Sequence, residues 1–187
     1  MACVEKKGTQ EERTFVFVDE AGFALLPAAV RTWAPRGQTP ILRYRYWEHL
    51  SVISAITADG DLYTMTQDKA IDSDAVVRFL KHLLRHLNGK LLIIWDGLPA
   101  HRSRKVKDFL REGGAARVHL AQLPGYAPDL NPDEATWHYL KNVELRNVCC
   151  HSLRELRDEL RKAIARLRRK PDIIQGFVRH VYSDIHV

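Results

Sequence analysis

The chain has 187 residues with 45% hydrophobic content, and its 29 Lys and Arg against 23 Asp and Glu give a formal net charge of +6. This length and apolar content suit one domain that buries a sizeable core, and no apolar run is long enough to span a bilayer. The basic balance favours a polyanion such as nucleic acid over an acidic protein surface as the partner.

The first predicted element follows a polar leader. Residues 1–13 are charged and lack periodicity, so we expect a flexible leader and no signal peptide. Residues 14–19 are β-branched and aromatic, which predicts a buried strand that ends at Asp19. Residues 23–40 are interrupted by prolines and predict a long irregular connection. From it Arg31 and Arg36 could contact DNA, whereas Trp33 is expected to pack.

The next segments predict strands and a helix in turn. Residues 49–58 and 61–66 read as strands joined by an Asp59-Gly60 hairpin turn, so the first three strands should be adjacent and antiparallel. A helix capped by Asp72 or Ser73 should end at Asn88-Gly89, because its apolar positions recur at helical spacing. Residues 90–95 are apolar enough for a central strand, which ends at Asp96.

The second half of the chain adds a further strand and several helices. We expect a helix over 103–112, a strand over 117–122, and a helix that begins at Asn131-Pro132. Ser152 should cap a last long helix, with a short helix near 172–181. This order predicts an α/β fold with a central mixed five-stranded sheet and helices on both faces.

Three carboxylates stand out from this pattern. Asp19 and Asp96 each follow an apolar strand, and the carboxyl ends of neighbouring strands lie side by side in a sheet. Glu134 could reach the same place from its helix, although a capping box with Asn131 would explain it equally simply. Asp129 and Asp133 are alternative third acids. Carboxylates held together need a cation, and their hard oxygens select Mg²⁺ or Mn²⁺, of which two ions can support in-line attack on phosphate.

Three blocks of the sequence also resemble a known family. They are Phe17-Val-Asp-Glu20, Ile94-Trp-Asp-Gly-Leu-Pro-Ala-His101, and Leu123-Pro-Gly-Tyr-Ala-Pro-Asp-Leu-Asn-Pro-Asp-Glu134 followed by Trp137, Leu140 and Lys141. These resemble the catalytic blocks of DDE transposases, above all the bacterial insertion-sequence group related to mariner elements. The resemblance runs from about residue 14 to residue 145. It implies an RNase H-like fold, two divalent metal ions, and the roles of Asp19, Asp96 and Glu134 as catalytic metal ligands.

The resemblance also implies a reaction and partners. Such enzymes cleave DNA strands and transfer the freed 3′-hydroxyl, so the expected partners are the ends of an insertion sequence and its target, with a homo-oligomer assembled on DNA. The implied location is the bacterial cytoplasm, at the nucleoid. Residues 14–187 would form one RNase H-like catalytic domain, with a core over 14–147 and C-terminal helices over 151–187.

Two departures from the family pattern bear on these expectations. Gly97 follows the second acid where relatives often carry Asn, and only a short leader precedes Asp19 where helix-turn-helix segments are usual. The chain would then be a catalytic fragment, a partner of a helix-turn-helix chain from an upstream reading frame, or a relic. An RNase H-like nuclease without strand transfer and an inactive DNA-binding module are the alternative functions.

Several further residues have two interpretations. His101 could approach phosphate or support a metal ligand, or it could simply pack; Lys141 is another candidate for a DNA or supporting contact. His82 and His86 lie one helical turn apart but lack a third ligand, which favours a partly exposed helix face. The basic residues of the last helix suit either intrahelical pairing or DNA contact. Cys149-Cys150-His151 is too tightly spaced for one tetrahedral ion, so we expect packing, and the odd cysteine number fits a reducing compartment.

Overall fold

The computed structural model describes residues 13–25, 33–38, 48–125 and 127–182. Its strands are β1 (Arg13–Ala24), β2 (His49–Thr57), β3 (Leu62–Gln67), β4 (Lys90–Trp95) and β5 (Val118–Gln122). Its α-helices are α2 (Ser73–His86), α3 (Arg104–Arg111), α4 (Asp133–Tyr139), α5 (Leu153–Arg168) and α6 (Pro171–Val181). A π-helical turn (Leu140–Glu144) continues α4, and 3₁₀ turns lie at Gly114–Ala116 and Pro128–Leu130. None of the described helices is long and apolar enough to cross a membrane.

The five strands form one mixed sheet in the order β3-β2-β1-β4-β5. β1, β2 and β3 pair antiparallel, as the hairpin signal at Asp59-Gly60 predicts, whereas β4 joins β1 in parallel and β5 joins β4 in parallel. The parallel pairs are connected through helices because a parallel neighbour needs a crossover. The predicted mixed five-stranded sheet is confirmed.

β1 is longer than its sequence pattern predicts. The predicted end at Asp19 is wrong, because the strand continues to Ala24 and pairs with β2 until Ala24 faces His49. The long β2 supplies antiparallel partners past the point where β4 stops. Phe23 and Leu25 are buried there, so the extension also carries core residues.

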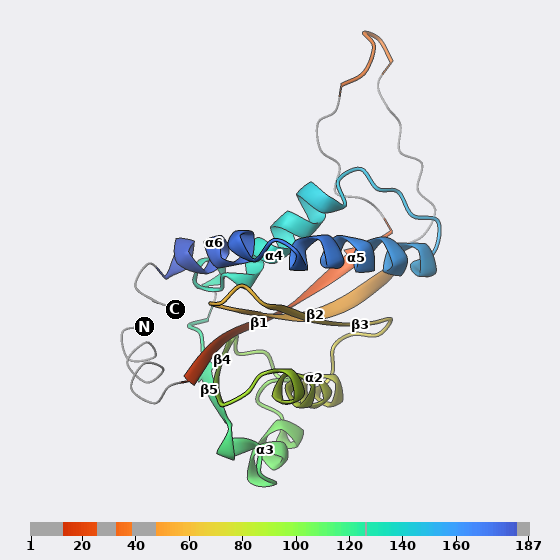
Figure 1. Ribbon diagram of the computed structural model, residues 1–187. Coiled ribbons are helices and arrows are strands. Elements are labelled where there is room, and N and C mark those ends of the chain that lie inside the picture. Colours follow the sequence, from red (N-terminus) through yellow and green to blue (C-terminus); the bar gives the residue numbers. More distant parts are fainter. Residues whose placement is uncertain (1–12, 26–32, 39–47, 126, 183–187) are drawn as a thin grey trace.

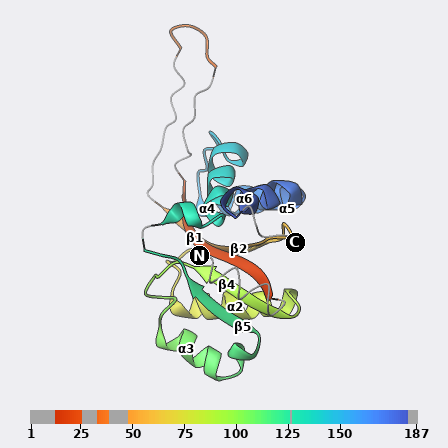
Figure 2. The ribbon, with the colours of Figure 1, turned by 90° about the vertical axis from the view of Figure 1, so that its left-hand side faces the viewer.

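Helices cover both faces of the sheet (Figures 1 and 2). α4, α5 and α6 lie on one face, and α2 and α3 lie on the other. Alternate residues of β1 supply the two cores: Phe15 and Phe17 pack on the side of α4, α5 and α6, and Val16 and Val18 pack on the side of α2 and α3. Over residues 15–18 of β1, the odd-numbered side chains therefore lie on the side of α4, α5 and α6, and the even-numbered side chains lie on the side of α2 and α3.

The predicted helix caps are mostly observed. The side chain of Asp72 accepts from the Ala75 N–H at 2.8 Å, and Ser103 and Ser152 cap α3 and α5 in the same way. α4 begins one residue later than predicted, with Pro132 rather than Asn131 at the cap position. The Asn131 side chain still accepts from the Asp133 N–H at 3.2 Å, so it stabilises this helix start.

Candidate active site

The sheet places Asp19 and Asp96 at the same level. In the parallel pairing of β1 with β4, Phe17 lies opposite Ile94. Asp19 follows Phe17 by two residues and Asp96 follows Ile94 by two residues, so the two acids lie next to each other. Because side chains alternate along a strand, both acids lie on the same face of the sheet as Phe17 and Ile94, whose side chains belong to the core under α4. Two acids that lie far apart in the sequence therefore emerge side by side on one face of the sheet.

Glu134 approaches from α4 and does not form the capping box that its spacing allows. A capping box would direct the Asn131 N–H at the Glu134 carboxylate, but this N–H donates to the Pro128 carbonyl at 2.8 Å. The Glu134 side chain is exposed in the first turn of α4. Its carboxylate is thus available to the space above the sheet edge.

A single pocket brings the three acids together. The pocket has a volume of about 550 Å³ and contains Asp19, Asp96 and Glu134 in its wall. We call it the acidic pocket. Its other described lining residues are Gly97, Leu98, Pro99, Arg102, Gln122, Leu123, Pro124, Gly125, Ala127, Pro128 and Asn131.

Three hydrogen bonds fix the start of α4 to the sheet beside this pocket. The Trp137 indole N–H donates to Asp19 Oδ2 at 2.9 Å, and the Asn131 amide donates to the Val18 carbonyl at 3.3 Å. The Ser54 hydroxyl donates to Asp133 Oδ2 at 2.5 Å, and Ser54 is the cross-strand partner of Asp19. Glu134 follows Asp133 directly, so these contacts determine where its carboxylate lies relative to Asp19.

The electrostatics of the acidic pocket favour a bound cation. Burial, and then the charge of Glu134, raise the pKa of Asp19 to about 7. A carboxyl whose pKa is raised by a neighbouring carboxylate gains most from a divalent ion, which neutralises both groups. The three acids present only oxygen ligands, and oxygen is what Mg²⁺ and Mn²⁺ prefer. The residues present therefore fit a divalent metal.

A second set of contacts, made by His101 and Glu20, holds the Asp96 carboxylate. His101 is 4% exposed, and its Nε2 lies 2.7 Å from Glu20 Oε1 while its Nδ1 lies 2.9 Å from Asp96 Oδ1. The imidazole ring also stacks on Trp95, with centroids 4.2 Å apart. Burial lowers the pKa of His101, but the hydrogen bonds and charges of Glu20 and Asp96 together outweigh it, so the pKa is raised.

Glu20, Asp96 and His101 also form a compact group of metal-ligating atoms. One such atom from each residue lies within 4.8 Å of the others. Both ring nitrogens of His101, however, already face carboxylates. We interpret His101 as a support for the Asp96 carboxylate, in the way that hydrogen-bonded neighbours orient metal ligands.

A close contact with Gln122 explains why glycine follows Asp96 in this chain. A Cβ at this position would meet the Gln122 side-chain nitrogen at 2.4 Å. Gln122 lines the acidic pocket from the end of β5, beside Gly97. A larger residue after Asp96 would require this glutamine to move.

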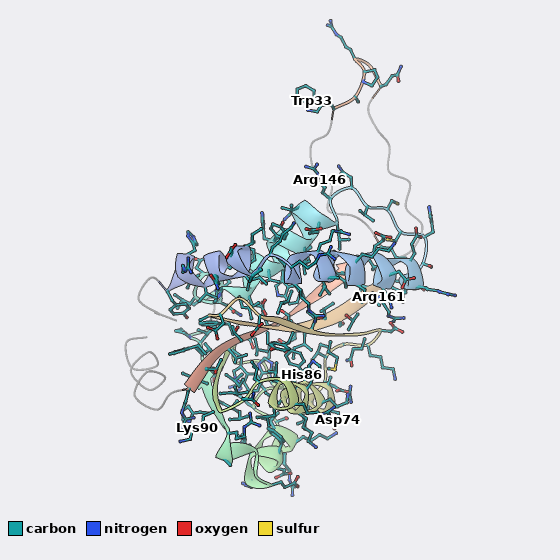
Figure 3. All side chains as sticks on the ribbon, in the orientation of Figure 1. Trp33, Asp74, His86, Lys90, Arg146 and Arg161 are labelled. Carbon is teal, nitrogen blue, oxygen red and sulfur yellow. The ribbon has the colours of Figure 1, made fainter. Side chains whose placement is uncertain are left out.

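The remaining predicted contact residues are scattered. Lys141 Nζ lies 5.2 Å from the centroid of the Phe23 ring. Arg36 is exposed, and Arg31 lies outside the described residues. The expectation that Trp33 packs is wrong, since its side chain is 100% exposed and stands clear of the layered body (Figure 3). The predicted packing of Cys150 agrees with its 5% exposure in the core.

The alternative acids point elsewhere. Asp133 is fully buried, and burial raises its pKa well above the usual range. Asp129 does not line the acidic pocket; it lines an adjoining hollow with His138 and His180, to which Glu134 also contributes. His82 and His86 lie together on α2 with ring centroids 4.2 Å apart, and neither belongs to a group of three ligands in the described part of the chain.

Most basic residues of α5 are paired with acids or carbonyls. Arg157 pairs with Asp68, Arg161 with Asp158, and Lys162 with Glu159. Arg166 pairs with Glu144, and Arg168 donates to the Leu62 carbonyl at 2.8 Å. The pairing interpretation of this helix is therefore favoured over a row of free DNA-contacting cations.

The sequence pattern missed three residues around the acidic pocket. Trp137 follows the third block of the sequence and has no assigned role there, yet it donates to Asp19. Glu20 ends the first block of the sequence without an assigned role, yet its carboxylate contacts His101. Arg102 received no role, yet it lines the acidic pocket. Arg102 directly follows His101, the last residue of the second block, and this position is the sequence signal that points to it.

Comparison with known proteins agrees with this geometry. A sequence model described as "DDE superfamily endonuclease" matches residues 14–157. The fold is similar to a Mos1 transposase paired-end complex with the left transposon end, with a TM-score of 0.68 at 16% identity, covering 98% of this chain and 59% of that one. It is also similar to the catalytic domain of Mos1 mariner transposase, with a TM-score of 0.63 at 13% identity, covering 98% and 89%. No curated protein matches.

These comparisons confirm the predicted RNase H-like fold, a mixed five-stranded sheet with helices as in the Mos1 catalytic domain. A Mos1 mariner paired-end complex with Mn is a further match, with a TM-score of 0.68 at 16% identity, covering 98% of this chain and 60% of that one. This chain spans 59% of the length of the Mos1 chain in the first of these complexes.

Proposed function

This chain belongs to the DDE superfamily of endonucleases, and from that premise we propose that it is the catalytic domain of a transposase. Its reaction would be metal-dependent cleavage of DNA strands at the ends of an insertion sequence, followed by transfer of the 3′-hydroxyl to a target. The observation that carries the proposal is the acidic pocket, where carboxylates from β1, the end of β4 and α4 converge.

Asp19, Asp96 and Glu134 would hold the metal. When bound, two Mg²⁺ or Mn²⁺ ions supply activation of the attacking hydroxyl and stabilisation of the leaving oxygen. The protein's own part is to hold the three carboxylates at fixed positions. Trp137 donates to one oxygen of Asp19 and so orients its carboxylate. His101, held by Glu20, orients Asp96.

Lys141, Arg36 and Arg31 would support the site or contact DNA without holding the metal. Lys141 lies over Phe23, and Phe23 packs edge-on against Trp137 with centroids 5.9 Å apart, so Lys141 supports the residue that orients Asp19. Arg36 is exposed on its turn and suits a backbone contact with DNA, and Arg31 remains a prediction of the same kind.

The partners of the proposal are DNA and other chains. The similar Mos1 structures are described as paired-end and strand-transfer complexes. We extend to this chain, as part of the proposal, a homo-oligomer on DNA and a separate helix-turn-helix chain that reads the element ends. The net charge of +6 suits a DNA substrate.

The central test is Asp96→Asn, which removes a ligand charge while nearly preserving side-chain shape. With Mn²⁺ or Mg²⁺, the unaltered chain should nick supercoiled plasmid, and Asp96→Asn should reduce nicking to background. Asp129→Asn is the matched control, because Asp129 is an acid outside the acidic pocket. Undiminished nicking by Asp96→Asn with an unchanged melting temperature would refute the assignment.

A second arm of the test separates the alternative functions. An oligonucleotide with a free 3′-hydroxyl is supplied with the plasmid, and joined product is sought. Cleavage without joining favours a nuclease of the same fold. Neither metal binding at millimolar concentrations nor cleavage, even with a separate DNA-reading chain present, would favour a DNA-binding module without activity.

A further inference from the structure

The acidic pocket contains one basic side chain, Arg102, for which no described residue serves as an ion-pair partner. Of the described residues that line it, Arg102 is the only Lys or Arg. The residue is exposed, and its guanidinium makes no ion pair with an acid in the described part of the chain. This is unusual here, because the pocket offers three carboxylates that an arginine could neutralise.

Most neighbouring basic residues are paired with acids. On the following helix, Lys105 pairs with Asp74 at 2.5 Å, and Arg104 and Arg111 pair with Asp108 at 3.6 and 3.1 Å. The bases of α5 are paired in a similar way. Lys107 of α3 also makes no ion pair with a described residue, so what distinguishes Arg102 is that it combines this lack of a pair with a place in the wall of the acidic pocket.

The backbone at Arg102 is held at a defined distance from Asp96. Asp96 Oδ1 accepts from the Leu98 N–H at 3.0 Å, and the His101 N–H donates to the Leu98 carbonyl at 3.0 Å. On one side of Arg102, His101 is buried against Trp95; on the other, Ser103 caps α3. The same loop thus fixes the Asp96 carboxylate and the backbone that carries Arg102 beside one pocket.

We propose that Arg102 binds a non-bridging oxygen of the DNA phosphodiester that occupies the acidic pocket. A guanidinium forms paired, charge-assisted hydrogen bonds with phosphate oxygens, and its planar shape makes this contact directional. Metal ions at Asp19, Asp96 and Glu134 would neutralise the carboxylates, and the arginine would then meet the phosphate from the Leu98 and Pro99 side of the pocket. The inference rests on the proposed function, since it assumes that DNA enters this pocket.

The test compares Arg102→Gln and Arg102→Lys with Arg111→Gln, which removes the same charge from the far end of α3 and lies outside the acidic pocket. Each substitution is placed in the full chain carrying Asp96→Asn, and binding of a fluorescein-labelled DNA duplex is titrated over a range of KCl concentrations with Mg²⁺ present. Arg102→Gln should weaken binding and lower the slope of log affinity against log salt by about 1. Arg111→Gln should change neither quantity in that way.

A rate measurement complements the binding data. In the chain with Asp96 intact, Arg102→Gln should slow single-turnover plasmid nicking by about tenfold or more, and Arg102→Lys should lie between it and the unaltered chain. Mn²⁺ binding should be unchanged, because Arg102 is not a ligand. Equal slopes and rates for Arg102→Gln and Arg111→Gln would overturn the inference and leave the proposed function standing. A chain that binds DNA without cutting it, even with a separate DNA-reading chain present, would refute the proposed function, and the salt slopes would still decide on Arg102.

Discussion

At Asp19 the proposed metal-binding role conflicts with the stability of the metal-free fold. Asp19 lies beside the core, receives one hydrogen bond from Trp137, and shares the acidic pocket with Glu134. Burial and the charge of Glu134 raise its pKa from 3.8 to about 7. Since the folded state binds this proton more tightly than the unfolded chain does, ionising Asp19 costs stability in the metal-free protein.

Asp19→Asn should therefore stabilise the metal-free chain at high pH. The stability that the Asp19 proton provides is fully present below pH 4 and is lost as pH rises towards 7. The neutral amide avoids this loss, so the variant should gain at most about 4 kcal/mol at pH 8 and nothing near pH 4, on the basis of ~1.4 kcal/mol per pKa unit. Urea unfolding in EDTA across this pH range measures the gain. A variant equally or less stable than the parent at pH 8 would contradict the pKa argument.

At the scale of elements, α6 depends on the β2–β3 turn beneath it. Gly60 has a φ of +92°, and a Cβ there would meet the Pro171 carbonyl oxygen at 2.7 Å. The Gln175 side chain of α6 donates to the Asp59 carbonyl at 2.9 Å in the same turn. The tight turn and the close approach of α6 thus require glycine for two separate reasons.

Gly60→Ala should destabilise the fold more than Gly89→Ala does. Both glycines have positive φ, so both variants carry strain of about 1–2 kcal/mol, but a Cβ at Gly89 meets nothing within 4 Å. The added contact with Pro171 should cost Gly60→Ala a further ~1–3 kcal/mol, since overpacking forces neighbouring atoms to shift. The free energies of unfolding of the two variants give this difference. If both variants lost the same free energy of unfolding, the contact between the new Cβ and Pro171 would be relieved by a movement of α6 that costs no stability.

At the scale of the whole molecule, the acidic pocket joins parts that are far apart in the sequence. Asp19 comes from β1, Asp96 from the loop after β4, and Glu134 from α4, and all three line one pocket. A cation bound there would connect the antiparallel half of the sheet, the parallel half and the covering helix layer. Metal binding should therefore stabilise the fold globally.

Mn²⁺ should raise the melting temperature of the chain. A ligand at 100 times its dissociation constant adds about 2.7 kcal/mol, which for a domain of this size is a shift of roughly 5–10 °C. Differential scanning fluorimetry with and without Mn²⁺ measures it. Asp96→Asn should lose most of the shift, whereas Asp129→Asn should keep it. An equal shift in all three proteins would place the metal outside the acidic pocket.

The sequence by itself determined the types and order of the main elements, and it predicted three acids as metal ligands, an assignment that stays a prediction. Periodicity reports which face of a segment is buried, and caps such as Asp72 and Ser152 mark helix starts locally. Asp96 was identifiable because it ends a run of apolar residues that only a central strand could bury. The RNase H-like fold followed from that order together with the family resemblance.

Only the tertiary structure decided which side chains face one another. It extended β1 beyond Asp19, buried Asp133 against Ser54 while leaving Glu134 in the acidic pocket, and left Arg102 without an acidic partner among the described residues. The physical reason is that each of these outcomes depends on contacts between segments distant in sequence. Local propensity and spacing carry no information about which atoms of such segments meet once the layers have packed.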